Sequence, residues 1–262
     1  MESKVMKKMR RHEERQIRKT NKKKNLCEQM IMASQNFNGS FNEEKVEEMR
    51  LQMQRQHIGI TCGQECRHQI TSRERWDSGE LLITFGTKNE RNTSNNMIKE
   101  GNVIFLNKYW AKAFLQGGKQ KKKYNDRLVT IRLPLRNRQT LYVINCHYPD
   151  SGKSKAIRRV FQLKLEQAIS DTKNNDIMVL IGDMNASTGI ADGKDDTVCG
   201  PHGATYQNEA GRTLKATAAI HELVDLITWS KQKMTASYYD ITTAKGKQID
   251  RAFVKQQHQH MT

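Results

Sequence analysis

A short, wholly apolar run at residues 177–181 is typical of a strand buried on both faces of a sheet. Asp183 and Asn185 follow this run, and side chains two residues apart in an extended chain point to the same side. A carboxylate beside a carboxamide can activate a water molecule and orient the anion that it attacks. Gly182, between the run and the acid, lets a ligand or another backbone segment approach closely. Without other signals, the segment is equally consistent with a strand that ends in an ordinary Asx turn.

Strand-like and helix-like segments alternate along the rest of the chain, which predicts an α/β or α+β domain. Residues 1–27 are expected to be a basic, disordered or helical tail, because residues 1–26 hold eleven Lys or Arg against three Glu. Residues 28–262 are expected to form one domain with a real core. Strands are expected at 26–33, 57–61, 81–85, 102–106, 128–133, 140–146, 177–181 and 249–255. Helices are expected at 42–56, 108–115, 154–171 and 212–224, with irregular chain at 67–101 and a flexible basic loop at 117–123.

Two of the expected helices have a clear apolar face. Ser40 and Glu43 form a capping box for helix 42–56, which carries a stripe of three apolar residues. In helix 154–171 the apolar residues recur at the spacing of one helix face. The two apolar faces consist of Val46, Met49 and Met53 in the first helix, and Ile157, Val160, Phe161, Leu165, Ala168 and Ile169 in the second.

The formal net charge of +17 at pH 7 draws the chain towards polyanions. DNA is the expected partner, with RNA as an alternative, because the attraction to a phosphate backbone does not depend on sequence. Basic clusters at 7–11 and 22–24 also resemble nuclear localisation signals. Solvated charge or an anionic membrane surface explains the same composition. The candidate nucleic-acid-binding residues are Lys22, Lys23, Lys24, Lys121, Lys122 and Lys123.

Five cysteines at scattered positions indicate a chain that resides in a reducing compartment. Cys62 and Cys66 form one CxxxC pair with no second pair and no well-spaced His, so a zinc site is not expected. The N-terminus lacks the apolar core of a signal peptide, and the longest apolar run is too short to span a bilayer. We therefore expect a nuclear or cytoplasmic protein that is not secreted and has no membrane partner and no small-molecule cofactor.

Other polar residues stand at the ends of the expected strands, where they can join Asp183 in one site. Most of them have an ordinary explanation as turn, surface or solvated residues. The acid at the start of the last apolar strand is different, because such an acid normally needs a partner. These additional candidates are Asn36, Asn38, Glu65, His147 and Asp250.

Taken in order, the motifs Asn-x-Asn, Gln-Glu, His-x-Pro, Gly-Asp-Met-Asn and Gln-Ile-Asp resemble the endonuclease/exonuclease/phosphatase family over residues 30–254. That family includes deoxyribonuclease I, apurinic/apyrimidinic endonucleases and the endonuclease domains of non-LTR retrotransposons. The nearest likeness is to retrotransposon endonuclease–reverse transcriptase proteins and craniofacial development protein 2-like sequences. It rests on 150–152, 200–203, 208–212 and 248–250. The resemblance implies a four-layer sandwich of two packed mixed β-sheets flanked by helices.

The resemblance also implies a phosphodiester hydrolase that uses Mg²⁺ or Mn²⁺. Glu65 matches the metal-binding Glu, Asn36 matches an Asn near the metal and the phosphate, and Asn38 stands where relatives have a second polar ligand. Asp183 matches the residue that positions or deprotonates the attacking water, and Asn185 matches the residue that orients the scissile phosphate.

Three positions depart from the pattern of the nearest relatives. His147 replaces a Tyr, although deoxyribonuclease I-like members have His there, so it is expected to hold the phosphate or donate a proton. Cys66 stands where a Thr commonly follows the metal-binding Glu, and Ser237-Tyr238 stands for a usual Thr-Trp.

The end of the chain departs most. In relatives, the Asp that Asp250 matches orients a catalytic His in a final Ser-Asp-His motif. In this sequence only twelve residues follow Asp250, and they contain no Ser-Asp-His motif. On this resemblance we expect a C-terminally truncated domain that lacks its last strand and exposes a sheet edge. His258 and His260 lie in a polar tail too close to Asp250 to replace the catalytic His. Losing such a motif lowers a rate by several orders of magnitude.

Three functions stay open from the sequence. The favoured one is a Mg²⁺-dependent endonuclease that nicks DNA, derived from a retroelement, with or without a reverse transcriptase in the same gene. The missing motif supports a non-catalytic remnant that binds nucleic acid. A phosphatase acting on another phosphoester keeps the family but changes the substrate, and the positive charge argues against it.

Overall fold

The computed structural model describes residues 30–39, 41–67, 71–86, 100–231, 238–239 and 246–261. The chain divides into two units, Met1–Ile31 and Met32–Thr262, and nearly all described residues belong to the second. The predicted basic tail with Lys22, Lys23 and Lys24 lies outside the described residues, as do Ser40 and Ser237.

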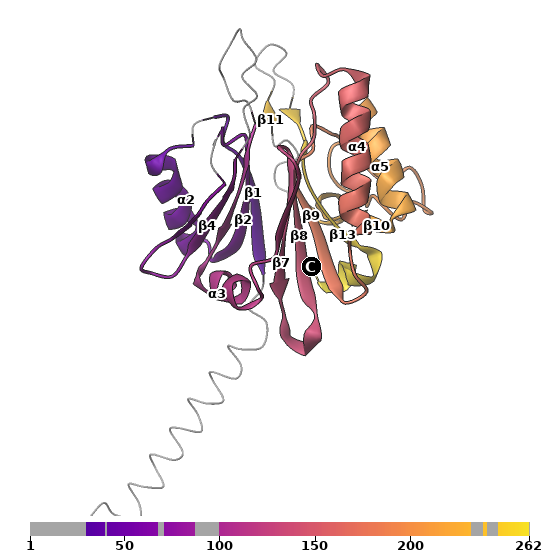
Figure 1. Cartoon of the computed structure of the whole chain (residues 1–262). Helices are drawn as coiled ribbons and strands as arrows, with labels where there is room; N and C mark the ends of the chain where they lie inside the picture. The colour runs from indigo at the N-terminus through magenta and orange to yellow at the C-terminus, as the bar shows by residue number, and fades with distance from the viewer. Residues whose placement is uncertain are drawn as a thin grey trace, which may run out of the picture. The chain divides into compact units, whose positions relative to one another are not determined.

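Two β-sheets form the middle of the second unit (Figure 1). The first sheet has five strands in the order β1 (Ile31–Asn36), β2 (Ile58–Gln64), β5 (Asn102–Leu106), β4 (Leu81–Phe85) and β3 (Arg73–Arg75). The second has six strands in the order β10 (Leu223–Asp225), β13 (Asp250–Lys255), β9 (Asp176–Asp183), β8 (Thr140–His147), β7 (Leu128–Pro134) and β6 (Lys121–Asn125). In the second sheet β8 and β9 are parallel, whereas the other pairs are antiparallel. A separate short ladder joins β11 (Tyr238–Tyr239) and β12 (Gly246–Lys247).

Helices cover the outer faces of both sheets (Figure 1). The first sheet carries α2 (Glu43–Arg55), and the second carries α4 (Lys155–Ser170) and α5 (Glu209–Ile220). The shorter helices are α3 (Lys108–Gln116), α6 (Leu226–Trp229), η1 (Arg136–Arg138) and η2 (Gln256–Met261). None of the helices that the structure describes is both long and apolar enough to cross a membrane.

Three apolar cores separate the four layers. The central core joins the two sheets, for example through Ile104 of β5 and Val179 of β9. An outer core joins α2 to the first sheet through Met53 and Phe105, and another joins α4 to the second sheet, where Leu165 is a member. This arrangement confirms the predicted fold class of two β-sheets flanked by helices.

The apolar run at 177–181 is confirmed as a doubly buried strand. In β9, Ile177, Val179 and Ile181 point into the central core, whereas Met178 and Leu180 point into the core below α4 and α5. Successive side chains of a strand alternate between its faces, so a strand covered on both sides needs apolar residues at every position.

Some elements differ from the sequence prediction. The loop predicted at 117–123 contains strand β6, because Lys121, Lys122 and Lys123 pair with β7 across a hairpin. The helix predicted at 212–224 is α5, which begins at Glu209 and ends at Ile220, and β10 takes the residues beyond it.

Helix boundaries and faces differ as well. The side chain of Asn42, not Ser40, caps α2 by accepting a hydrogen bond from the Lys45 N–H. In α4, Ile157 and Val160 are 51% and 60% exposed, so they do not belong to the buried face. The helix turns these two residues away from the sheet, and its buried face consists of Phe161, Leu165, Ala168 and Ile169.

Candidate active site

The candidate residues meet where strands of both sheets end. His147 and Asp183 are the last residues of the parallel strands β8 and β9 and lie in register with each other. Asp250 opens β13 and pairs with Asp183 from the antiparallel side. Asn36 ends β1, and the N–H of the next residue, Phe37, donates to the carbonyl of Gln64 at the end of β2. Side chains far apart in sequence are thereby brought to one edge.

Asn36 joins the two acids of the site. Its amide nitrogen lies 3.1 Å from Oε1 of Glu65 and 3.0 Å from Oδ2 of Asp183, and it donates a hydrogen bond to each. Its Oδ1 accepts a hydrogen bond of 2.9 Å from the N–H of Asn38. These contacts fix the orientation of the amide, so both of its donors face carboxylates.

Asp183 is almost fully buried and held in place from two sides. Besides the bond from Asn36, its Oδ1 accepts the N–H of Asn185 at 3.0 Å. Burial raises the pKa of Asp183, whereas the hydrogen bonds from Asn185 and Asn36 lower it. A buried carboxylate with a raised pKa accepts a proton more readily than a solvated one, which suits the activation of water.

Glu65 links this pair to a buried histidine. Its Oε1 lies 3.3 Å from Nε2 of His147. Burial, and after it the nearby guanidinium of Arg127, lower the pKa of His147 to about 3. The imidazole is therefore neutral at neutral pH and orients Glu65 as a neutral ring. That state does not favour the proton donation expected from the resemblance.

Arg127 is a site neighbour that the sequence reasoning missed. Its guanidinium lies 3.3 Å from Nδ1 of His147, and its Nε donates to Glu100 at 2.8 Å. Its carbonyl accepts the N–H of His147 at 2.8 Å. Nothing in the local sequence distinguishes this Arg from the many solvated ones, because both of its partners come from other segments.

Gly182 makes room for a close approach of the backbone. Its φ is +149°, and a Cβ at this position would lie 1.9 Å from the carbonyl oxygen of Cys146. Any side chain here would push β9 away from β8 and separate Asp183 from His147. The predicted role of this glycine is confirmed, with backbone as the neighbour.

Asn185 is fixed by backbone contacts. It has a positive φ of 45°, and its side-chain nitrogen donates to the carbonyl of Tyr148 at 2.8 Å. Its own carbonyl accepts a bond of 3.1 Å from the side chain of Asn208, the N-cap residue of α5. The side-chain amide is thereby held at the pocket wall, and none of the other described residues accepts a hydrogen bond from its second N–H.

One pocket of about 570 Å³ contains most of these side chains. His147 is not part of its lining; it is buried and contacts the pocket through Glu65. Lys121, Lys122 and Lys123 do not line it either, since they belong to the edge strand β6. The predicted site residues that do line it are Asn36, Asn38, Glu65, Asp183, Asn185 and Asp250.

The two C-terminal histidines lie away from this pocket. His258 and His260 belong to η2, which follows the end of β13 opposite to Asp250. The N–H of Gln256, at the start of η2, donates to the carbonyl of Glu222 beside β10. The structure therefore separates both histidines from Asp250 by the length of a strand.

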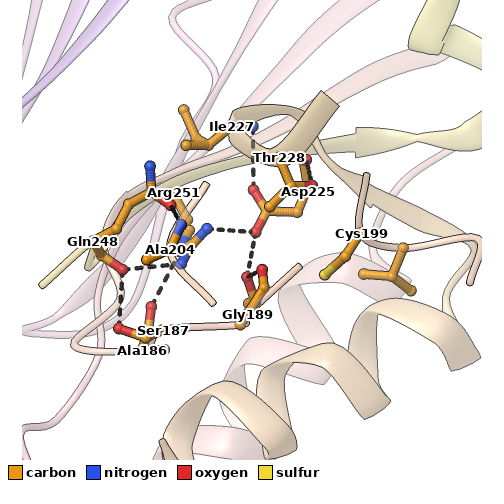
Figure 2. A network of polar contacts seen from close by, with 12 residues as sticks. Ala186, Ser187, Gly189, Cys199, Ala204, Asp225, Ile227, Thr228, Gln248 and Arg251 are labelled. Carbon is orange, nitrogen blue, oxygen red and sulfur yellow. Dashed lines mark hydrogen bonds and ion pairs between the residues drawn. The ribbon is translucent and has the colours of Figure 1, made fainter. Parts of the chain in front are cut away.

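A buried polar network supports the segment that follows Asp183 (Figure 2). The guanidinium of Arg251 donates to the carbonyls of Ala186 and Gln248 at 3.3 and 3.0 Å, and to the carboxylate of Asp225 at 3.0 Å. Asp225 also accepts the hydroxyl of Thr188 at 2.8 Å. Burial raises the pKa of Asp225, and the adjacent guanidinium opposes this shift.

The network ties three segments of the site together. Arg251 stands next to Asp250, Ala186 stands next to Asn185, and both Arg251 and Asp225 are fully buried. The sequence suggested that Asp250 needs a partner. The charge that is fully buried at the start of β13 is that of Arg251.

Within the described ranges, no group of three or more His, Cys, Asp or Glu side chains forms a ready metal site. The donor set nevertheless fits Mg²⁺ or Mn²⁺, because Glu65, Asn38, Asp183 and Asp250 present oxygen atoms to one pocket. Mg²⁺ keeps several waters and needs only one or two protein carboxylates.

Solved structures share this fold, although neither a protein-family model nor a curated protein matches the sequence. An AP endonuclease from Leishmania major aligns with a TM-score of 0.59 at 11% identity, over 87% of this chain and 79% of that one. A 3′ phosphatase from Neisseria, bound to a product DNA hairpin, aligns with a TM-score of 0.55 at 12% identity over 88% of each chain. An endonuclease/exonuclease/phosphatase family protein from Leptotrichia buccalis gives 0.54 at 13%, over 86% of this chain and 87% of that one. The chain thus has the fold of the endonuclease/exonuclease/phosphatase family.

Proposed function

We propose that this chain is a divalent-metal-dependent phosphodiesterase that nicks DNA. The observation that carries the proposal is the hydrogen-bonded row of Glu65, Asn36 and Asp183 in a single pocket. The solved structures with the same fold include an AP endonuclease and a 3′ phosphatase bound to DNA, which supports a phosphoester substrate.

In this function Asp183 holds the attacking water and takes its proton, since its carboxylate is buried and its pKa is raised. Asn185 donates its second N–H to a phosphate oxygen, because Tyr148 already fixes the plane of its amide. Asn36 keeps Asp183 and Glu65 apart and correctly oriented. Glu65 and Asn38 would hold the metal, with His147 orienting Glu65. When bound, Mg²⁺ or Mn²⁺ neutralises charge on the phosphoryl oxygens.

We further propose a retroelement origin and residence in the nucleus or cytoplasm, both supported by sequence alone. A non-catalytic nucleic-acid-binding protein is the second candidate, favoured by the distance of His258 and His260 from Asp250. A phosphatase is the third, favoured by the likeness to the Neisseria 3′ phosphatase.

The test is the nicking of supercoiled plasmid by the purified chain in Mg²⁺ and in EDTA. The wild-type protein is expected to nick only with Mg²⁺, and Asp183→Asn is expected to abolish nicking. Asp192→Asn is the matched control, because Asp192 is an exposed acid that binds Lys215 outside the pocket. Circular dichroism checks that each variant is folded.

A folded wild-type protein that releases no nicked circle in Mg²⁺ contradicts the proposal. If that protein still retards the plasmid on a gel, the non-catalytic alternative holds. Release of inorganic phosphate from a 3′-phosphorylated oligonucleotide, without nicking, would instead assign the phosphatase.

A further inference from the structure

A second hollow of about 300 Å³ adjoins the candidate active site. It shares Arg158, Glu209 and Ala210 with the first pocket, so the two hollows lie side by side, and we call the second one the groove. Both of its walls are helices, α4 on one side and α5 on the other. The remaining lining residues are Tyr148, Lys155, Arg159, Gln162 and Thr213.

Three cations of α4 dominate the charge of this second hollow. Lys155, Arg158 and Arg159 are spaced by three and four residues, so they share one helix face. The opposing acid is Glu209, which is exposed and lies 3.3 Å from Arg158. No hydrogen bond or ion pair connects the side chain of Lys155 or Arg159 to another of the described residues, and both side chains are exposed. Their charge is therefore available to a ligand.

Arg158 stands where the two hollows meet. Its side chain is only 16% exposed, and its Nε is buried without a hydrogen-bond partner among the described residues. A buried N–H with no acceptor is costly, so a shift of the Arg158 guanidinium towards an anionic oxygen in the groove would relieve that cost.

The floor of the hollow is neutral and rigid. Gln162 accepts the hydroxyl of Tyr148 at 3.2 Å and donates to Thr217 of α5 at 2.6 Å. These bonds hold α4 and α5 together below the cations. The groove therefore combines a fixed floor with positive charge on one wall.

Unlike the cations of α4, the three lysines of β6 contact other side chains of the protein. Lys122 pairs with Asp171 at 2.6 Å, and Lys123 pairs with Asp126 at 2.5 Å. Lys121 lies over the ring of Phe85. Their charge is largely used within the protein, although the sequence alone favoured them as nucleic-acid contacts.

We propose that the groove of Lys155, Arg158 and Arg159 binds the phosphate backbone of a nucleic acid strand that flanks the bond held at Asp183. The inference rests on the proposed function, since it takes the first pocket as the place of the scissile phosphate. Three cations along a groove match the repeated negative charge of a strand.

The test compares two double variants that each remove two positive charges, Lys155→Gln/Arg159→Gln and Lys122→Gln/Lys123→Gln. Binding of a fluorescein-labelled duplex is measured by anisotropy in EDTA over a range of salt concentrations. The slope of log K against log salt is expected to fall by about 2 in the α4 variant, because each lost phosphate contact removes about 0.9. It is expected to change much less in the β6 variant. Lys155→Arg/Arg159→Lys, which keeps the charge, should bind like the wild type.

Equal slopes for the two charge-removing variants would overturn the proposal, as would loss of binding in the charge-preserving one or no binding by the wild type. Binding in EDTA does not depend on hydrolysis. If the wild type nicks plasmid but the α4 variant keeps the wild-type salt slope, only the proposed groove is disproved. If the wild type does not nick but the salt slope falls in the α4 variant, the groove proposal stands and the proposed catalysis is disproved.

Discussion

Asn36 separates two carboxylates that would otherwise repel each other. Glu65 and Asp183 each accept a hydrogen bond from its side-chain NH₂ group. The pKa of Asp183 is raised by burial and, to a lesser extent, by the negative charge of Glu65. A neutral donor between two acids compensates both without adding charge. The geometry of the pair therefore depends on this single amide.

Replacing Asn36 by alanine is expected to lower the nicking rate by roughly 10²–10³-fold, the usual cost of removing one oriented donor from an active site. Asn36→Asp should be at least as inactive, because it adds a third negative charge and removes the donor. Plasmid nicking with protein in excess measures the rate, and thermal unfolding checks the fold. Nicking within a few-fold of wild type in both variants would disprove the role of the amide.

The described cysteines are expected to be unreactive in the folded protein. Cys62, Cys66, Cys146 and Cys199 are buried free thiols, and burial raises the pKa of each, to about 11 for Cys199. The thiolate is the reactive form, so little of it exists at pH 8. Iodoacetamide at pH 8 should label these four only after denaturation, as read by peptide mass spectrometry. Rapid labelling of any of them in the native protein would contradict their burial.

At the level of elements, β13 is anchored to its surroundings by a buried ion pair. Arg251→Met leaves Asp225 buried without its counter-charge and is expected to destabilise the protein by roughly 3–5 kcal/mol. Arg251→Met/Asp225→Leu should recover part of that loss, because no lone charge stays buried. Urea unfolding measures both. The control is Arg50→Met, which breaks a surface pair with Glu47 and a longer pair of 3.8 Å with Glu80, and should change stability much less. Equal effects of Arg251→Met and Arg50→Met would contradict the account.

Elements with a local apolar pattern were predictable from the sequence. Strands β4 and β5 have the predicted bounds, 81–85 and 102–106, since each is an apolar run between polar segments. Strand β6 was missed because three lysines give no apolar signal, and its conformation is set by pairing with β7. Strand β10 was missed because its apolar residues continue the period of the helix before it. The conformation of such segments depends on pairing with distant strands, and the local sequence does not reveal that pairing.

The same distinction holds for the site. Asp183 and Asn185 were predicted from the apolar run before them, and Asn36 and Glu65 from their places at strand ends together with a motif order that resembles a known family. Arg127 and Arg251 were not, since His147 and Asp225, the side chains that they contact, lie 20 and 26 residues away in sequence. A basic residue inside the otherwise apolar run of β13 was the one local signal for Arg251.

On the scale of the whole molecule, the metal is expected to serve chemistry and not folding. Three apolar cores hold the layers together, and the acids of the site are hydrogen-bonded to Asn36, Asn185 or His147 without a metal. A structural metal site behaves differently, because its ligands have no other partners and its removal unfolds the protein.

EDTA is therefore expected to abolish nicking and to lower the melting temperature only by the few degrees that loss of the bound Mg²⁺ accounts for. Adding Mg²⁺ at ten times its Kd should stabilise the fold by about 1.4 kcal/mol through mass action, which corresponds to roughly 3–6 °C for a domain of this size. Differential scanning calorimetry with and without EDTA measures both shifts, and plasmid nicking is followed on the same samples. A fall of more than about 10 °C in EDTA would contradict this expectation. Such a fall would mean that the metal is structural, because a structural ion supplies much of the free energy of folding. Unchanged nicking in EDTA would instead remove the metal from the mechanism and leave Asp183 and Asn185 to act alone.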